Sequence, residues 1–185
     1  MSNDTRSGSG VVGTLRTIDG KGVVRMEDAY DTDIEDLWTA LTDPRRLRRW
    51  IADVEGDLRL GGVFRARFTS TWEGSGRVDV CERPTRLVVT MTDEDEETVI
   101  EAWLTAEGAH TRLVIEERGL PLGELAGHGA GWQAHVEDLA THLAGQPAAD
   151  WKTRWLDLTP SYRERAENLA SPTRRRATQT PRSTL

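Results

Sequence analysis

The sequence predicts an α+β fold in which a curved antiparallel sheet wraps around one long C-terminal helix. Between Asp57 and Arg118, apolar residues recur with the period of two that is typical of strands. The joints between these runs are too short for parallel crossovers, which favours an antiparallel meander. Beyond them, one apolar stripe with helical spacing predicts a helix over 130–144, ended by Gly145. The stripe consists of Trp132, Val136, Leu139 and Leu143.

The sheet is expected to begin with a hairpin and to continue after two short helices. The turn signal Asp19-Gly20-Lys21-Gly22 joins strands at Val11–Leu15 and Val23–Met26. The later strands are predicted at Val63–Phe68, Gly74–Val80, Leu87–Met91, Val99–Leu104 and Thr111–Arg118. A helix that lies across such a sheet buries one face of each element and can leave a cavity between them.

The two short helices are predicted from their start signals. Thr32 and Glu35 fit a capping box, in which each side chain satisfies a free amide of the first turn. Pro44 is suited to the first position of the second helix, which is expected to end near Trp50.

Composition excludes several classes of protein. The chain has 185 residues, 37% hydrophobic and 30% charged, which suits one soluble domain with appendages. A net charge of -7 argues against a nucleic-acid binder, because such proteins are basic. The single Cys81 excludes an internal disulfide and a cysteine-rich metal site. No apolar run approaches the roughly 20 residues of a membrane span, so we expect no membrane insertion and a cytoplasmic location.

The chain is expected to contain one folded domain and three appendages. These are a disordered N-terminus at 1–10, the domain at 11–145, a helical appendage at 146–170 and a disordered tail at 171–185. In the appendage, Pro160 is expected to divide the helix into two pieces. Its aromatic face (Trp151, Trp155, Leu158 and Tyr162) either mediates a homodimer or folds back on the outer face of the sheet, where Trp103 is predicted.

An ordered set of short motifs carries a resemblance to a known family. The motifs are Leu37-Trp38-Thr39-Ala40-Leu41-Thr42-Asp43-Pro44, Leu47, Trp50, Gly61-Gly62, Gly76-Arg77-Val78, Arg83-Pro84, Arg86-Leu87, His110-Thr111-Arg112-Leu113 and Gly131-Trp132. Together they span Val11 to Gly145, and the chain resembles the START-like (SRPBCC) superfamily, in the branch named for the activator of the heat-shock-protein-90 ATPase. The resemblance implies a helix-grip fold with an internal cavity for an apolar small molecule. It implies no single activity, because relatives include lipid carriers, polyketide cyclases and co-chaperones.

Strand parity indicates which side chains face the long helix. Besides Val80, Leu87, Ile100 and Leu113, these are Phe64, Ala66, Phe68, Val78, Val89, Met91, Ala102, Leu104 and Ile115. They either line a cavity or pack a solid core. Trp50, Phe64, Phe68 and Trp132 are the stronger candidates for cavity walls, because large rings frame apolar ligands well.

The same parity turns Glu117 inward, where its carboxylate can bind a polar ligand group or act as an acid or base. The alternative is a solvated position at the rim. His128, His135 and His142 share one flank of the long helix, but seven-residue spacing is too wide for one metal ion. We expect no metal and no cofactor, with His128 and His135 as candidate ligand contacts.

Two further groups of residues have simpler interpretations. The cluster formed by Arg45, Arg46, Arg48 and Arg49 is interpreted as a solvated face, with a phosphate or acidic partner as the alternative. Cys81 is expected to face away from the cavity, and no histidine lies near it in sequence to activate it.

The leading hypothesis is therefore binding of an apolar or amphipathic small molecule between the sheet and the long helix. An enzyme of the polyketide cyclase or hydrolase type would use the same cavity, with Glu117 as its candidate acid or base. A co-chaperone or stress-response partner protein would use the outer surface. The segment Arg25-Met26-Glu27-Asp28 weakens that third hypothesis, because it is acidic where a basic residue is common in the family.

Overall fold

The computed structural model describes residues 10–93 and 96–171. The strands are β1 (Val12–Ile18), β2 (Lys21–Tyr30), β3 (Ala52–Gly56), β4 (Val63–Phe68), β5 (Glu73–Glu82), β6 (Arg86–Asp93), β7 (Glu96–Glu107) and β8 (His110–Leu120). The helices are α1 (Ile34–Thr42), α2 (Pro44–Leu47), α3 (Leu125–Leu143) and α4 (Trp151–Ala170). The segments predicted to be disordered lie outside the described residues, apart from Gly10 and Ser171.

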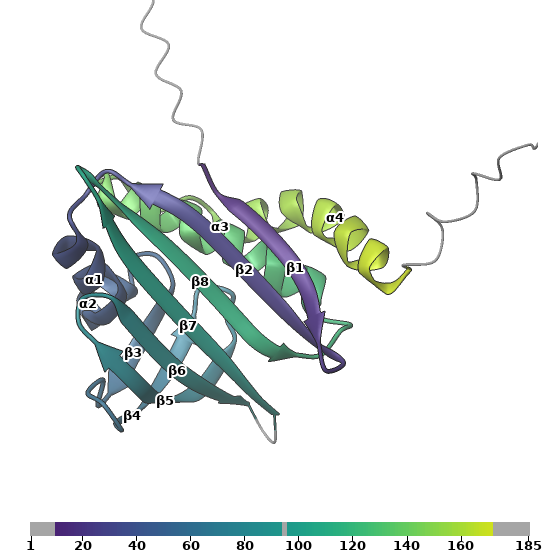
Figure 1. The fold of residues 1–185 in the computed structure, drawn as a ribbon, viewed down its shortest axis with the longest axis horizontal. Coiled ribbons are helices and arrows are strands. Elements are labelled where there is room, and N and C mark those ends of the chain that lie inside the picture. The colour runs from purple at the N-terminus through teal and green to yellow at the C-terminus, as the bar shows by residue number, and fades with distance from the viewer. Residues whose placement is uncertain (1–9, 94–95, 172–185) are drawn as a thin grey trace, which may run out of the picture.

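The strands form one eight-stranded antiparallel sheet in the order β1-β2-β8-β7-β6-β5-β4-β3 (Figure 1). The long helix α3 packs across β2 and β1, while α1 and α2 bridge from α3 to β3. The core therefore lies between the inner face of the sheet and these helices. This arrangement confirms the predicted α+β helix-grip fold. Within the described residues, no helix is long and apolar enough to cross a membrane.

The structure corrects the start of α1 and adds a strand. Asp33, not Thr32, caps α1 by accepting a hydrogen bond of 2.8 Å from the backbone N–H of Asp36. Glu35 pairs instead with Arg83. The strand β3 was not predicted, because it is short and directly follows the turn after α2.

A β-bulge in β5 reverses the parity that the sequence predicts beyond Val78. Val78 lies opposite Val89, but Val80 lies opposite Val88, so one residue is inserted between the two pairs. Val80 therefore shares the outer face with Val88. Cys81 pairs with Leu87 and takes the inner parity, contrary to prediction, although it is exposed at the end of the strand.

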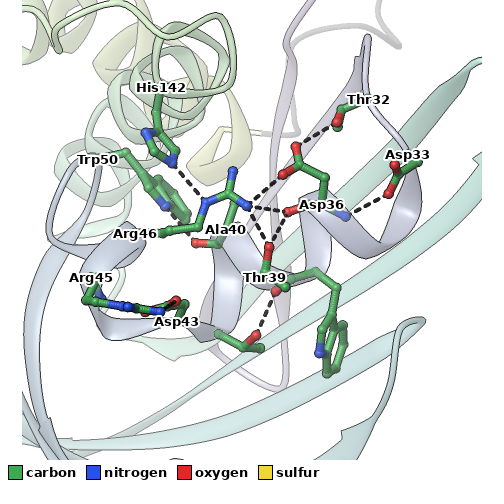
Figure 2. Close-up of polar contacts among 12 residues, drawn as sticks. Thr32, Asp33, Asp36, Thr39, Ala40, Asp43, Arg45, Arg46, Trp50 and His142 are labelled. Atoms are coloured by element: carbon green, nitrogen blue, oxygen red, sulfur yellow. Dashed lines mark hydrogen bonds and ion pairs between the residues drawn. The ribbon is translucent and has the colours of Figure 1, made fainter.

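A polar cluster joins α1 and α2 to the C-terminal end of α3 (Figure 2). Arg46 donates hydrogen bonds to the Asp36 carboxylate (2.8 Å) and the Thr39 hydroxyl (2.6 Å), and its Nε donates to Nε2 of His142 (3.2 Å). Arg46 is thus a structural residue and not part of a solvated face. Arg45, in contrast, is exposed and pairs only locally with Asp43.

The appendage forms one helix, α4, which packs against α3 and β1 (Figure 1). Pro160 lies within this helix and does not divide it. Tyr162 is fully buried, and its hydroxyl donates to the side-chain oxygen of Gln133 at 2.8 Å. Its ring occupies a notch formed by Gly13 of β1 and Gly129 of α3, where a Cβ at either position would collide with it. The expectation that the appendage covers the outer sheet face is therefore wrong.

Arginines cover much of the outer face instead. The Glu101 carboxylate accepts hydrogen bonds from Arg86 and Arg118, both at 2.8 Å. Glu116 accepts from Arg16 at 2.7 Å and from Arg118 at 3.2 Å. Both glutamates are buried beneath these guanidinium groups, which is how a buried carboxylate is normally tolerated.

The loop between α3 and α4 is held by Asp138, which is only 5% exposed. Its carboxylate accepts a hydrogen bond from the backbone N–H of Ala149 at 3.2 Å. Burial nevertheless raises the pKa of Asp138 from 3.8 to about 6. Because the folded state holds this proton more tightly than the unfolded state, the contribution of Asp138 to stability is lost as pH rises through about 6.

We therefore expect Asp138→Asn to stabilise the protein at neutral pH. The full shift corresponds to about 3 kcal/mol, and screening near the surface should reduce the gain to roughly 1 to 2 kcal/mol. Urea unfolding at pH 7.5 should show this gain, and at pH 4.5, which is still above the unfolded pKa of 3.8, only about a third of it should remain. The control is Asp150→Ala, which removes the N-cap side chain of α4 and should destabilise. Equal effects of Asp138→Asn at both pH values would contradict the prediction.

Candidate ligand-binding site

An apolar cavity of about 120 Å³ lies between the sheet and the helices. Among its lining residues, Thr42 is the polar exception. The others are Leu41, Leu47, Trp50, Ile51, Ala52, Val54, Leu58, Phe64, Ala66, Phe68, Val78, Leu87, Val89, Met91, Ile100, Ala102, Ile115 and Trp132. Strands β4 to β8 supply one wall, and α1, α2, β3 and α3 supply the rest.

Most residues predicted to face the long helix lie on this inner cavity. From strand parity these are Phe64, Ala66, Phe68, Val78, Leu87, Val89, Met91, Ile100, Ala102 and Ile115, and the rings of Trp50 and Trp132 join them. Leu104 is buried but does not line this cavity, because its end of β7 is covered by α1. The residues that sequence reasoning missed come mainly from β3 and its flanks, such as Val54 and Leu58.

A wider cleft of about 860 Å³ borders the inner cavity. The two share Phe68, Met91, Ile100 and Trp132 as lining residues, so these side chains separate the apolar interior from a more polar mouth. The polar and aromatic residues of the cleft include Trp72, Asp93, Glu96, Thr98, Glu117, Glu124, His128, His135, Trp151, Lys152 and Trp155.

Glu117 is the central polar residue of the cleft. It is only 5% exposed, so the solvated-rim alternative is wrong. Its Oε2 accepts hydrogen bonds from the indole N–H of Trp132 (2.7 Å) and contacts Nδ1 of His128 (2.8 Å). Its Oε1 accepts a longer bond from the Thr98 hydroxyl (3.3 Å). Oε2 is therefore fully used, whereas Oε1 keeps capacity for another donor.

The two histidines of the cleft differ in their charge states. Burial lowers the pKa of His128, but its hydrogen bond to Glu117 and the negative charge there outweigh burial, so the pKa lies above its usual value. Burial lowers the pKa of His135 to about 4. His135 is therefore neutral at neutral pH, and its Nδ1 donates to the carbonyl oxygen of Trp50 at 3.3 Å.

Helix α4 contributes two tryptophans to the cleft that the sequence suggested only as a contact surface. Trp151 stacks on His135, with ring centroids 5.3 Å apart, and on Trp155, at 6.0 Å. Trp155 is fixed by donating to the backbone oxygen of Gly127 at 3.0 Å. The aromatic spacing at 151 and 155 was the available signal, but only the packing of α4 shows that it faces the cleft.

The chemistry available here is apolar binding and proton exchange. Glu117 and His128 form a carboxylate–imidazole pair that can hold or move a proton. Among the described residues, no group of three or more histidine, cysteine, aspartate or glutamate side chains could hold a metal ion. The exposed Cys81 lines neither cavity.

Comparison with known proteins agrees with this architecture. Structural similarity is found to CalU16 from Micromonospora echinospora, with 26% identity, a TM-score of 0.71, and coverage of 86% of this chain and 98% of that one. DynU16, from the dynemicin biosynthetic locus, is 28% identical with a TM-score of 0.64, over 69% of this chain and 50% of that one. An Hsp90 activator from Plasmodium falciparum shares the fold at 21% identity and a TM-score of 0.56, over 68% of this chain and 97% of that one.

No protein with a curated description matches the chain. Residues 31–144, which are more than half of the chain, match the family described as activator of Hsp90 ATPase homolog 1-like protein. This match contains α1, most of the sheet and all of α3, and it ends before α4. The chain therefore belongs to the family of activator of Hsp90 ATPase homolog 1-like proteins.

Proposed function

We propose that the protein binds an apolar or amphipathic small molecule between the sheet and α3. The observation that carries this proposal is an apolar cavity that borders a cleft with a polar mouth. Ligand sites in proteins are typically apolar with a few placed polar groups, and this is the composition found here. DynU16 comes from a biosynthetic locus, which is consistent with a small organic ligand.

Filling the inner cavity should abolish binding. Ala66 of β4 is 4% exposed and lines the cavity, so Ala66→Trp places a large ring in the ligand space. Native mass spectrometry of freshly purified protein should show a small molecule that is released on denaturation, and the variant should lose it. Ala66→Leu is the milder variant if the tryptophan prevents folding, since overpacking costs about 1 to 3 kcal/mol.

The matched control is Ala106→Trp, which adds the same ring at an exposed position near the end of β7. This control should retain the ligand. Equal ligand occupancy in folded Ala66→Trp and in Ala106→Trp would contradict the proposed site.

An enzyme that uses the same cavity is the second candidate. The observation that favours it is the contact of the buried Glu117 carboxylate with His128, whose side chain is partly exposed, beside an apolar cavity. In that case Glu117 is the acid or base, and its charge is essential to turnover. A co-chaperone or stress-response role through the outer surface is the third, and it would survive filling of the cavity.

We also propose a cytoplasmic location and a homodimer through the appendage. The single exposed thiol of Cys81 suits a reducing compartment. On α4, Leu156 is 53% exposed and Leu169 is 37% exposed, so apolar surface is left for a contact between chains. The same native mass spectra distinguish a dimer from a monomer.

A further inference from the structure

The cleft is bounded by two walls of aromatic rings. One wall comes from the β4–β5 connection, where Phe68 and Trp72 lie 5.2 Å apart between ring centroids. The other comes from α3 and α4 and consists of Trp132, His135, Trp151 and Trp155. The walls meet at Phe68 and His135, whose centroids are 6.3 Å apart. A cleft that narrows between two sets of rings is suited to a flat molecule.

Trp151 differs from the other tryptophans of the cleft in the hydrogen bonding of its indole N–H. Its indole Nε1 is the one buried side-chain polar atom among the described residues that has no hydrogen-bond partner. The other cleft indoles are satisfied: Trp72 donates to Asp93 at 2.8 Å, Trp132 to Glu117 and Trp155 to Gly127. A buried donor without a partner costs free energy, so the ring of Trp151 is less firmly held than the other three indoles of the cleft.

The polar end of the cleft favours a ligand group that donates hydrogen bonds or carries a positive charge. Carboxylates of Asp93, Glu96, Glu117 and Glu124 line it, whereas Lys152 and His128 are the basic residues among its lining. Glu117 keeps capacity at Oε1, deep in the cleft, where Thr98 contacts it weakly at 3.3 Å. A cleft with an excess of one sign of charge concentrates ligands of the opposite sign.

We infer that the cleft binds a planar aromatic molecule that carries an amine, with its rings between the aromatic walls and its ammonium group at Glu117. This inference rests on the proposed binding function and specifies its ligand class. Both ends of the site are needed: the tryptophans of α4 select planarity, and Glu117 selects the positive charge. Helix α4 lies beyond the segment that matches the family, so the preference for a planar ring depends on the appendage, whereas Glu117 lies within the matched segment.

Three simple probes test this by isothermal titration calorimetry on the full chain. They are 1-naphthylmethylamine (planar, cationic), 1-naphthalenemethanol (planar, neutral) and cyclohexylmethylamine (cationic, not planar). The naphthyl amine should bind about 10-fold more tightly than the alcohol, because a charge-assisted hydrogen bond contributes on the order of a factor of ten in affinity. It should bind several-fold more tightly than the cyclohexyl amine, because only a planar aromatic ring stacks on the aromatic walls.

Two variants test which residue produces the preference for an amine and which produces the preference for a planar ring. Glu117→Gln should bring the affinity ratio of naphthyl amine to naphthyl alcohol close to 1. Trp151→Leu should lower the ratio of naphthyl amine to cyclohexyl amine several-fold, and Trp151→Phe should restore it, because a planar ring is kept. Trp103→Leu on the outer face is the matched control and should change neither ratio.

The outcomes separate this inference from the proposed function. Binding of the neutral alcohol without preference for the amine, or ratios that Glu117→Gln and Trp151→Leu leave unchanged, would overturn the inference alone. Absence of binding by all three probes would count against both the inference and the proposed apolar site.

Discussion

Replacing Tyr162 by alanine should lower the free energy of unfolding by about 3 to 5 kcal/mol, the usual cost of removing a buried aromatic side chain. Tyr162 is fully buried between α4, α3 and β1, and it fills the notch at Gly13 and Gly129. Its loss leaves a cavity where the appendage meets the domain. Urea unfolding followed by circular dichroism measures the change.

Two controls divide this effect into its parts. Tyr162→Phe keeps the ring and loses the hydroxyl's hydrogen bond to Gln133 and its weak one to the Met26 sulfur, so it should cost about 1 kcal/mol. Leu156→Ala on the exposed side of α4 should change stability by less than about 0.5 kcal/mol. If Tyr162→Ala behaves like Leu156→Ala, α4 is not part of the same folding unit as residues 11–145.

The same contacts explain an unexpected feature of the sequence. The segment Gly127-His128-Gly129-Ala130-Gly131 is a poor helix former, and the predicted helix therefore began at Ala130. In the structure α3 begins at Leu125, because the glycines allow Tyr162, Trp155 and Trp151 to approach the helix closely. A cost in helix propensity is thus offset by packing against α4, which local sequence does not reveal.

Strand parity predicted the cavity lining well wherever the ladder is regular. Phe64 and Ala66 in β4, and Val89 and Met91 in β6, all lie on the inner cavity. Strand parity gave the wrong face for Val80, because a bulge inserts one residue before it and the hydrophobic pattern of the sequence does not reveal that insertion.

The polar part of the site was predicted only in outline. Parity turned Glu117 inward, but its partners Trp132 and His128 come from α3, and sequence spacing alone could not show that they converge on one oxygen. His135 was predicted only as a candidate ligand contact, and the sequence did not show that Trp151 stacks on it and leaves it 5% exposed. Contacts between distant elements therefore decided the charge states of the site.

Removing the charge of Glu117 should reverse the direction in which the pKa of His128 departs from its usual 6.5. In the native protein, burial lowers this pKa, but the hydrogen bond and charge of Glu117 outweigh burial and hold it above 6.5. In Glu117→Gln the charge of residue 117 is gone, and burial outweighs the weaker attraction that Glu124 still exerts, so the pKa should fall below 6.5. NMR titration of the His128 ring protons measures it.

The His142 signal is the internal control, because its pKa is lowered by burial and by Arg46 and Arg49. It lies on α3 about 21 Å of helix rise beyond His128. If the pKa of His128 stays above 6.5 in Glu117→Gln, Glu117 is not the group that raises this pKa.

The reversal also changes how stability depends on pH. Because the folded native protein holds the His128 proton more tightly than the unfolded chain, its contribution is present below pH 6.5 and is lost as pH rises through the folded pKa. In Glu117→Gln the contribution has the opposite sign, so the variant should gain relative stability as pH rises through 6.5. At pH 6 the lost charge-assisted bonds should cost on the order of 2 kcal/mol.

Turnover then separates the two candidate functions. If the cavity catalyses a reaction with Glu117 as acid or base, Glu117→Gln should lower the rate by roughly 10²- to 10⁴-fold. If the cavity only binds, the variant should lose about one order of magnitude in affinity for a cationic ligand and nothing further. Because His128 keeps its place through α3 in both cases, its shifted NMR signal shows that the variant is folded when the rate is measured.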